Sequence, residues 1–235
     1  MPAPVLPPSG PYGADDGRAD PAVLAVLAAH LGGTAGLDEV VRVLRTARVL
    51  VPVLPTAVET ELSTTGATVE KVVQMSTVTV TGRDGRRALP VFTSVESMTA
   101  WDRDARPFPA SAPAAAAGAF AEGAVALLVD FAGPYHVVVE GAPMRALAEG
   151  RDWLPADRDP EVRGAVQAAL AGLPGLASLD IRSAPEADLA LTIHVDATGA
   201  DHVREVAQEA AARLARVDLL RDRLERGLDV AAVVG

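Results

Sequence analysis

Residues 189–195 read Leu-Ala-Leu-Thr-Ile-His-Val, the clearest alternation of large apolar side chains with small or polar ones in this sequence. Successive side chains of a strand point to opposite faces, so the run predicts a strand with one buried face and one open face. A shorter alternation at 179–182 and an apolar run at 228–234 predict two further strands.

Helical patterns surround these strands. Asp159 followed by Pro160 is typical of a helix start, because proline fits the first helical position and aspartate caps it. A second helix is predicted from Thr198 and Asp201, which resemble a capping box. The two helices would bury stripes made of Val162, Val166, Leu170 and Leu173, and of Val203, Val206, Ala210 and Leu214. The order α-β-β-α-β predicts a small domain over residues 160–235.

The first part of the chain contains a strong hairpin signal. The turn sequence Gly82-Arg83-Asp84-Gly85 separates a Val- and Thr-rich run at 72–81 from the segment 87–93, and an Asp-Gly step favours a tight hairpin turn. Pro52 predicts that the strand around it lies at a sheet edge. Helices are expected at 21–31, 37–48, 94–101, 111–122 and 143–150, and further strands at 49–54, 124–131 and 136–139.

The predicted organisation is therefore two small domains of α/β (α+β) class, each a mixed sheet with flanking helices. Residues 1–20 are rich in proline and read as a disordered tail. Residues 21–151 form the first domain. Charge and proline replace apolar residues at 152–159, which we interpret as a linker, and residues 160–235 form the second domain.

Composition excludes several classes of protein. The 31 acidic and 21 basic residues give a net charge of −10, and each part of the chain is net acidic, which argues against nucleic-acid binding. Absence of cysteine excludes a disulfide scaffold and a thiolate nucleophile. The longest strongly apolar run, 124–129, is far shorter than the ~20 residues of a membrane span. With no signal-peptide pattern, we expect a cytoplasmic protein without a membrane partner.

Five residues are candidate ligand-binding groups. Arg83, Arg86 and Arg87 cluster at the hairpin turn, where guanidinium groups could hold a phosphate or carboxylate, although exposed turns are commonly charged. Asp130 and His136 flank a strand connection, and loops on a rigid scaffold often carry function. A turn with a satisfied aspartate would explain the same residues without a ligand.

Other candidate residues have simpler interpretations. Trp101 and Trp153 could be interface anchors, or could cap a core. A metal site could be suggested by His194, Asp196 and His202. Zinc needs three or four converging ligands, however, and only two of these residues are neighbours in the sequence. No nucleophile elbow, Walker A loop or dinucleotide fingerprint occurs. We therefore expect no metal, no cofactor and no catalytic residue.

Two segments carry a family resemblance. QMSTVTVTGRDGRRALPVFTSVESMTAW at 74–101, continuing to Arg106-Pro107, and VALLVDFAGPYHVVVEG at 125–141 resemble the N-terminal domain of the SseB family, named for enhanced serine sensitivity. The helix from Pro160, the strand 190–196 and the closing LDVAAVV at 228–234 resemble the SseB C-terminal domain. The resemblance covers residues 22–235 and implies a soluble bacterial protein with a link to serine tolerance and no established catalytic residues.

The sequence leaves three functions open. The first is a non-enzymatic interaction or regulatory protein that binds an unidentified protein partner through exposed sheet edges and the hairpin tip. The second is a sensor of small anions or amino acids built on the hairpin arginines. An enzyme is the least favoured, because these residues would have to converge on one well-formed pocket. The sequence does not predict an oligomeric state.

Overall fold

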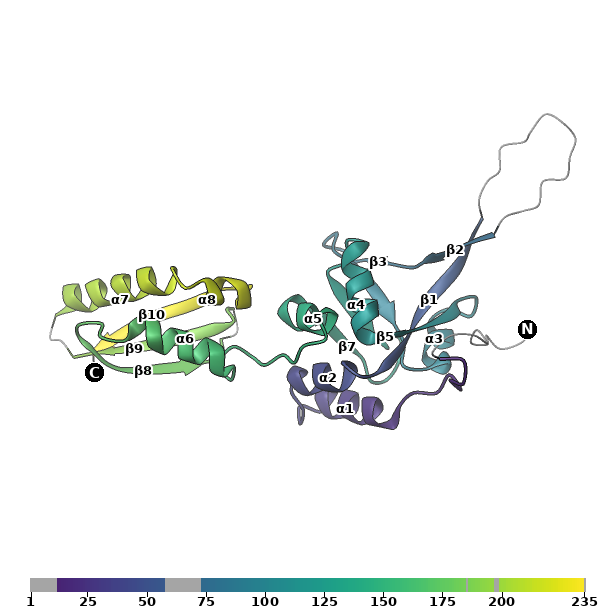
Figure 1. Ribbon diagram of the computed structural model, residues 1–235, viewed down its shortest axis with the longest axis horizontal. Helices are drawn as coiled ribbons and strands as arrows, with labels where there is room; N and C mark the ends of the chain where they lie inside the picture. The colour runs from purple at the N-terminus through teal and green to yellow at the C-terminus, as the bar shows by residue number, and fades with distance from the viewer. Residues whose placement is uncertain (1–11, 58–72, 185, 197–198, 235) are drawn as a thin grey trace, which may run out of the picture. The chain divides into compact units, whose positions relative to one another are not determined.

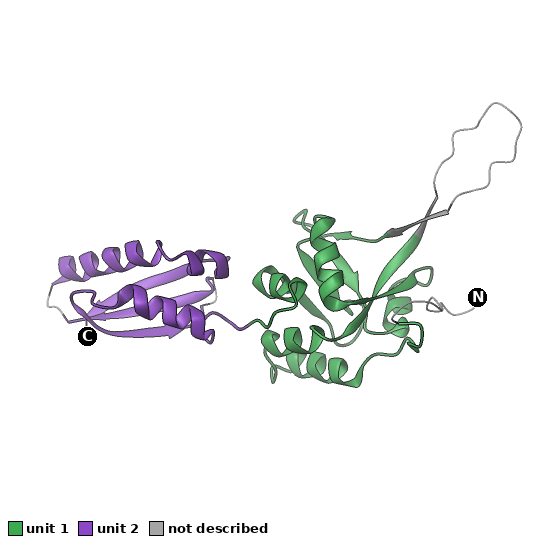
Figure 2. Ribbon diagram, viewed as in Figure 1, with its two compact units in different colours: residues 1–153 green, residues 154–235 purple. Residues whose placement is uncertain are grey.

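A computed structural model describes residues 12–57, 73–184, 186–196 and 199–234 of the chain. Two compact units, Met1–Trp153 and Leu154–Gly235, emerge from its internal contacts (Figure 2). Both contain helices packed on sheets, so the predicted α+β class is confirmed. The first part of the expected tail, residues 1–11, lies outside the described residues.

Unit 1 carries five helices and seven strands among its described residues (Figure 1). In chain order they are α1 (Pro21–Leu31), α2 (Leu37–Leu44), β1 (Arg48–Ala57), β2 (Val73–Thr77), β3 (Val80–Thr81), β4 (Arg87–Val91), α3 (Val95–Trp101), β5 (Arg106–Ser111), α4 (Ala112–Ala121), β6 (Ala126–Val129), β7 (Val137–Glu140) and α5 (Gly141–Ala148).

These strands form two sheets. The order in the first is β2-β1-β5, all antiparallel, and in the second β3-β4-β6-β7, in which β4 and β6 run parallel. A single bridge joins them, because Leu50 and Phe92 exchange backbone hydrogen bonds of 2.7 and 2.9 Å. Alternation along β1 divides the interior in two. Val49 and Val51 face the main core with α1, α2, α4 and α5, whereas Leu50 packs with Phe92 and Met98 under α3.

Short polar side chains cap several helices, at the predicted Ser94 and Ser111 and at Asp20, which was not predicted as a cap. Asp20 accepts a hydrogen bond of 2.8 Å from the amide of Ala22, and Ser94 accepts one of 3.0 Å from Ser97. Ser111 caps α4 in the same way. Each oxygen satisfies an amide that has no partner inside the helix, so the short polar residue determines where each helix begins.

Residues 12–20 differ from the expected tail. Arg48, at the start of β1, forms an ion pair with Asp15 and donates to the carbonyl oxygens of Thr93 (2.6 Å) and Arg18 (2.7 Å). The amide of Val95 donates to Gly17. Composition alone suggested disorder here, whereas a guanidinium with several donors ties this segment to two strand ends.

Two prolines explain where sequence and structure disagree about strands. Pro52 was expected at an edge, yet β1 is the middle strand of its sheet. The Leu50 amide points to Phe92, away from β5, and the nitrogen of Pro52 points to the same side because it lies two residues further along the strand. On that side the pairing with β2 begins only at Val53. No amide donor is needed there. The strand β5 was not predicted, because Pro107 and Pro109 obscure it.

Unit 2 consists of α6 (Pro160–Leu170), β8 (Leu176–Arg182), β9 (Leu189–Val195), α7 (Ala200–Leu214), α8 (Asp218–Arg223) and β10 (Leu228–Val234). The strand order is β10-β9-β8, with β8 antiparallel and β10 parallel to β9 (Figure 1). The predicted α-β-β-α-β succession is present, and α8 occupies the stretch before the last strand that the sequence left open as helical or irregular.

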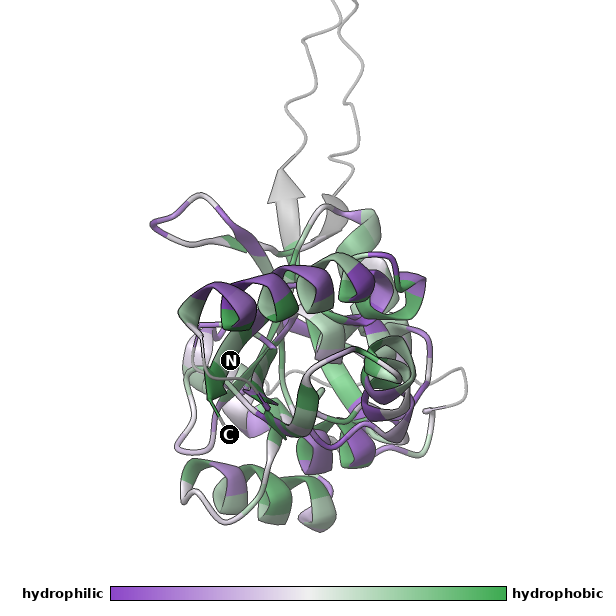
Figure 3. Ribbon diagram, turned by 90° about the vertical axis from the view of Figure 1, so that its left-hand side faces the viewer, coloured by the Kyte–Doolittle hydropathy of each residue, from purple (hydrophilic) through white to green (hydrophobic). Residues whose placement is uncertain are grey.

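One face of this sheet is buried and the other is open. Leu189, Leu191 and Ile193 of β9 are fully buried against α6 and α7. The alternate residues Ala190, Thr192 and His194 fall on the other face and are only partly buried. Helices banded in hydrophilic and hydrophobic colours show the matching amphipathic pattern (Figure 3).

Candidate functional site

The hairpin turn between β3 and β4 is built as the sequence predicts. Gly82 and Arg86 are joined by a backbone hydrogen bond of 2.8 Å, and Gly85 adopts a φ of +80°, which a residue with a side chain would rarely adopt. Asp84 accepts from the Arg86 amide at 3.1 Å and from its guanidinium at 2.6 Å. The turn therefore holds Arg86 in a fixed orientation.

Two of the hairpin arginines have partners within unit 1. Arg86 also forms an ion pair of 2.8 Å with Glu140 of β7, and Arg87 donates to the Glu122 carbonyl oxygen at 2.7 Å and to Thr79 at 2.8 Å. The hydrogen bonds from Arg86 hold the pKa of Asp84 below its ordinary 3.8, and Asp84 and Glu140 in turn raise the pKa of Arg86. Both arginines thus stabilise the hairpin against neighbouring elements.

Asp130 lies at the opposite end of the same sheet. It directly follows β6 and is 4% exposed, with its carboxylate accepting from the Thr93 amide (2.9 Å), the Thr93 hydroxyl (2.5 Å) and the Ser97 hydroxyl (2.7 Å). Its φ of +48° makes it the only non-glycine residue with positive φ among the described residues. Asp130 therefore joins the ends of β4 and β6 to the start of α3.

The five candidate ligand-binding residues do not converge. Because β4 and β6 run parallel, Arg86 and Arg87 lie where both strands begin, and Asp130 lies where they end. His136 is exposed in the connection to β7, at the Asp130 end. A single pocket formed by all five is not present in the described part of unit 1, and a role for the arginines in binding stays a prediction.

The two tryptophans are half-buried. Trp101 packs against Phe92 and Phe131, with ring centroids 5.5 and 5.9 Å apart, in the small core under α3. Trp153 packs at the margin of the main core. Both positions fit the core-capping interpretation, and contact with a partner stays a prediction.

Two other histidines, His194 and His202, lie near carboxylates. His194 lies 3.3 Å from Asp180 on the open face of unit 2, and His202 lies 3.6 Å from Glu205 on α7. Across residues 12–57, 73–184, 186–196 and 199–234, no three acidic or histidine side chains could hold a metal ion together. None of the helices described there is long and apolar enough to span a membrane.

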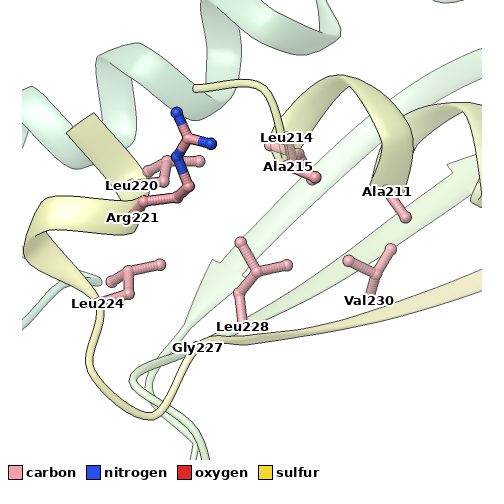
Figure 4. A pocket seen from close by; sticks show the side chains of 9 residues that line it. All are labelled: Ala211, Leu214, Ala215, Leu220, Arg221, Leu224, Gly227, Leu228 and Val230. Atoms are coloured by element: carbon pink, nitrogen blue, oxygen red, sulfur yellow. The ribbon is translucent and has the colours of Figure 1, made fainter. Parts of the chain in front are cut away.

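An apolar groove in unit 2 was not anticipated. It has a volume of about 550 Å³ and lies between the helix pair α7–α8 and the beginning of β10 (Figure 4). Its walls are Ala211, Leu214, Ala215, Leu220, Arg221, Leu224, Gly227, Leu228 and Val230. Arg221, the one charged residue among them, pairs with Asp218. We call this feature the β10 groove.

The β10 groove borders a sheet edge. Within the described residues, β9 lies on one side of β10 and no strand lies on the other. The strand reads Leu-Asp-Val-Ala-Ala-Val-Val, with no proline and one charge, and long apolar edges of this kind favour pairing with another strand. That composition was the available sequence signal, but the groove itself depends on how α8 returns toward β10.

Comparison with known proteins identifies a family for most of unit 1. Residues 22–146 match the family described as SseB protein N-terminal domain, and the chain belongs to this family. The match ends within α5, so the resemblance of unit 2 to the SseB C-terminal domain stays a prediction. No curated protein and no solved structure matches the chain.

Proposed function

We propose that this SseB-family chain is a non-enzymatic interaction protein that binds a protein partner along β10. The observation that carries the proposal is the β10 groove beside an open strand edge. Backbone groups of such an edge can pair with an added strand, and alternate side chains of that strand can enter an adjoining apolar pocket. A regulatory, cytoplasmic role connected with serine tolerance is the biological setting that we propose for this binding.

The lining of the groove supports binding over chemistry. Eight of its nine residues are apolar or glycine, and the guanidinium of Arg221 is held by Asp218. Such a surface gains free energy by removing apolar area from water, at about 25 cal/mol per Å². None of the described residues that line the groove is an aspartate, glutamate or histidine, the residues that most often perform general acid–base catalysis.

Two alanines on α7 provide a matched test. Ala211 and Ala212 are both exposed, but only Ala211 lines the β10 groove. Full-length wild type, Ala211→Trp and Ala212→Trp would be compared as baits in cross-linked capture from cells of the source organism. Proteins retained by wild type and Ala212→Trp but lost with Ala211→Trp support the proposal. If every captured protein binds all three baits equally, β10 is not the binding surface.

A second candidate function, a small-anion or amino-acid sensor, rests on the hairpin. Arg83 is exposed at the turn and has no carboxylate partner in the described part of the chain, next to the oriented guanidinium of Arg86. Calorimetry with serine and with inorganic phosphate tests this alternative. Heat of binding in wild type that disappears in Arg86→Ala would support this function. If neither ligand gives heat of binding, the hairpin does not bind serine or phosphate and this function is refuted.

A further inference from the structure

The backbone groups of β10 divide into two sets. The amide of Asp188 donates to the carbonyl oxygen of Gly227 at 3.0 Å, so this carbonyl points toward β9, and the amide of Leu228, on the opposite side of the same peptide plane, points away from β9. Alternation along β10 then directs the amides and carbonyls of Asp229, Ala231 and Val233 toward β9. The even-numbered residues of β10 direct their amides and carbonyls outward, where an added strand would pair.

Apolar side chains are distributed unevenly along the strand. Leu228 and Val230, at its beginning, line the β10 groove and are partly buried. At its end, Val234 is 61% exposed and Val233 is 41% exposed. One end of β10 thus offers a cavity, and the other offers uncovered apolar side chains.

We propose that the occupant of this edge is a second copy of the chain, paired antiparallel through β10 about a two-fold axis at Ala231. This inference rests on the proposed binding role of β10. The register uses the whole strand, from Leu228 to Val234, and makes Ala231 face its own copy. A two-fold interface uses the same surface twice, so each strand must supply both halves of the contact.

The two ends of β10 meet this requirement. In the two-fold register Val234 of one copy lies opposite Leu228 of the other, on the helix-covered side, and therefore beside the β10 groove. The symmetry repeats this contact, so both grooves receive an exposed valine. Each chain supplies the apolar group that its copy lacks, which favours a second copy over an unrelated strand.

Charge is compatible with the same register. Asp229 is the only charged residue on β10, and it lies opposite Val233 of the other copy, not opposite its own counterpart. Like charges directly opposite each other would destabilise a strand pair. Because each chain carries a net charge of −10, we expect added salt to strengthen the association by screening the general repulsion.

Single cysteines test the register, since the chain has no cysteine of its own. The Ala231 pair would be a non-hydrogen-bonded antiparallel pair, whose Cα atoms lie about 4.5 Å apart, within disulfide range. Ala231→Cys in the full-length chain is therefore expected to form a disulfide-linked dimer with copper–phenanthroline as oxidant. Val233→Cys, on the same open face, is the control, because its copies would lie about 13 Å apart along the strand.

Sedimentation over about a hundredfold range of protein concentration gives the second readout. A monomer–dimer equilibrium, together with cross-linking of Ala231→Cys at least tenfold faster than of Val233→Cys, supports the inference. A monomer throughout, or equal cross-linking of both variants, overturns it. If the chain is monomeric yet Ala211→Trp still loses a captured protein, the binding role of β10 survives and only the identity of its occupant is wrong.

Discussion

The strands β5 and β10 both lie at the edge of a sheet, but they present different edges. In β1 the Leu50 amide points away from β5, so Leu50 and Pro109, which lie opposite each other, do not exchange hydrogen bonds. The nitrogen of Pro109 therefore points away from β1, toward the open edge, and so does the nitrogen of Pro107 two residues earlier. A proline has no amide hydrogen, so the β5 edge lacks these donors. β10 has no proline and keeps all its outward amides.

This difference extends to the two units. Unit 1 uses its polar groups internally, through Arg48, Asp130, Arg86 and Arg87, and it blocks an edge with proline. The described residues of unit 2 include a sheet edge and an open apolar groove beside it. We interpret unit 1 as the region stabilised by its own polar contacts and unit 2 as the region whose surface is completed by association.

Removal of the Asp130 carboxylate should give the largest effect. Asp130→Ala leaves the buried amide and hydroxyl of Thr93 without this acceptor and puts alanine at positive φ, so we expect a loss of about 3 kcal/mol. Both tryptophans lie in unit 1, so their fluorescence follows its unfolding in denaturant. Asp130→Asn tolerates the backbone conformation and should lose less. Unchanged stability in Asp130→Ala would contradict an internally stabilised unit 1.

The second-largest loss of stability is expected for Arg48→Lys. Lysine keeps the charge but lacks the planar fork that reaches Asp15 and two carbonyl oxygens together, so we expect unit 1 to lose about 2 kcal/mol. Limited proteolysis should then cleave within residues 12–20 faster than in wild type. Wild-type resistance in the lysine variant would show that charge alone holds this segment.

Ala232→Pro makes the β10 edge more similar to that of β5. The amide of Ala232 points outward, so proline removes an edge donor while the ladder with β9 stays intact. We expect the dimer affinity to fall at least tenfold, about 1.4 kcal/mol, measured by sedimentation. Val233→Pro is the contrasting variant, because its amide faces β9 and its loss should destabilise unit 2. Equal effects of both prolines on folding would refute the assigned directions.

The smallest expected effect concerns Asp84. Arg86→Ala removes the guanidinium hydrogen bond, the largest cause of the lowered pKa of Asp84, and keeps the one from the backbone amide, so that pKa should move toward 3.8, as followed by carboxyl carbon chemical shifts. A lowered folded-state pKa means that the ion pair stabilises the protein above the unfolded pKa and loses this contribution as the pH falls through the folded value. Both side chains are well exposed, so stability near neutral pH should change little.

Local signals in the sequence account for much of the fold. The turn at Gly82–Gly85, the caps Ser94 and Asp159, and the alternation of β9 were predicted, because each depends on residues adjacent in the chain. The strand β5 was missed because its prolines are acceptable only on outward-facing positions, which the sequence does not show. Residues 12–20 depend on Arg48, more than 25 residues away.

The candidate site shows the same limit. Sequence analysis singled out the hairpin arginines as a cluster, but Glu140 and the Glu122 carbonyl, which accept hydrogen bonds from Arg86 and Arg87, come from distant elements. Arg86 and Asp130 were grouped together, yet parallel pairing of β4 and β6 puts them at opposite ends. The β10 groove required the position of α8 relative to β10, a tertiary relation without a local pattern.

The parallel pairing of β10 with β9 also bears on the order of folding. β8 and β9 are adjacent in the chain, whereas β10 reaches β9 only after the long crossover through α7 and α8. Contacts between distant residues form later because their loop-closure entropy is greater, so we expect β10 to join last and to open first. Amides of Leu191 and Ile193, directed to β10, should exchange with solvent faster than those of Ala190 and Thr192, directed to β8.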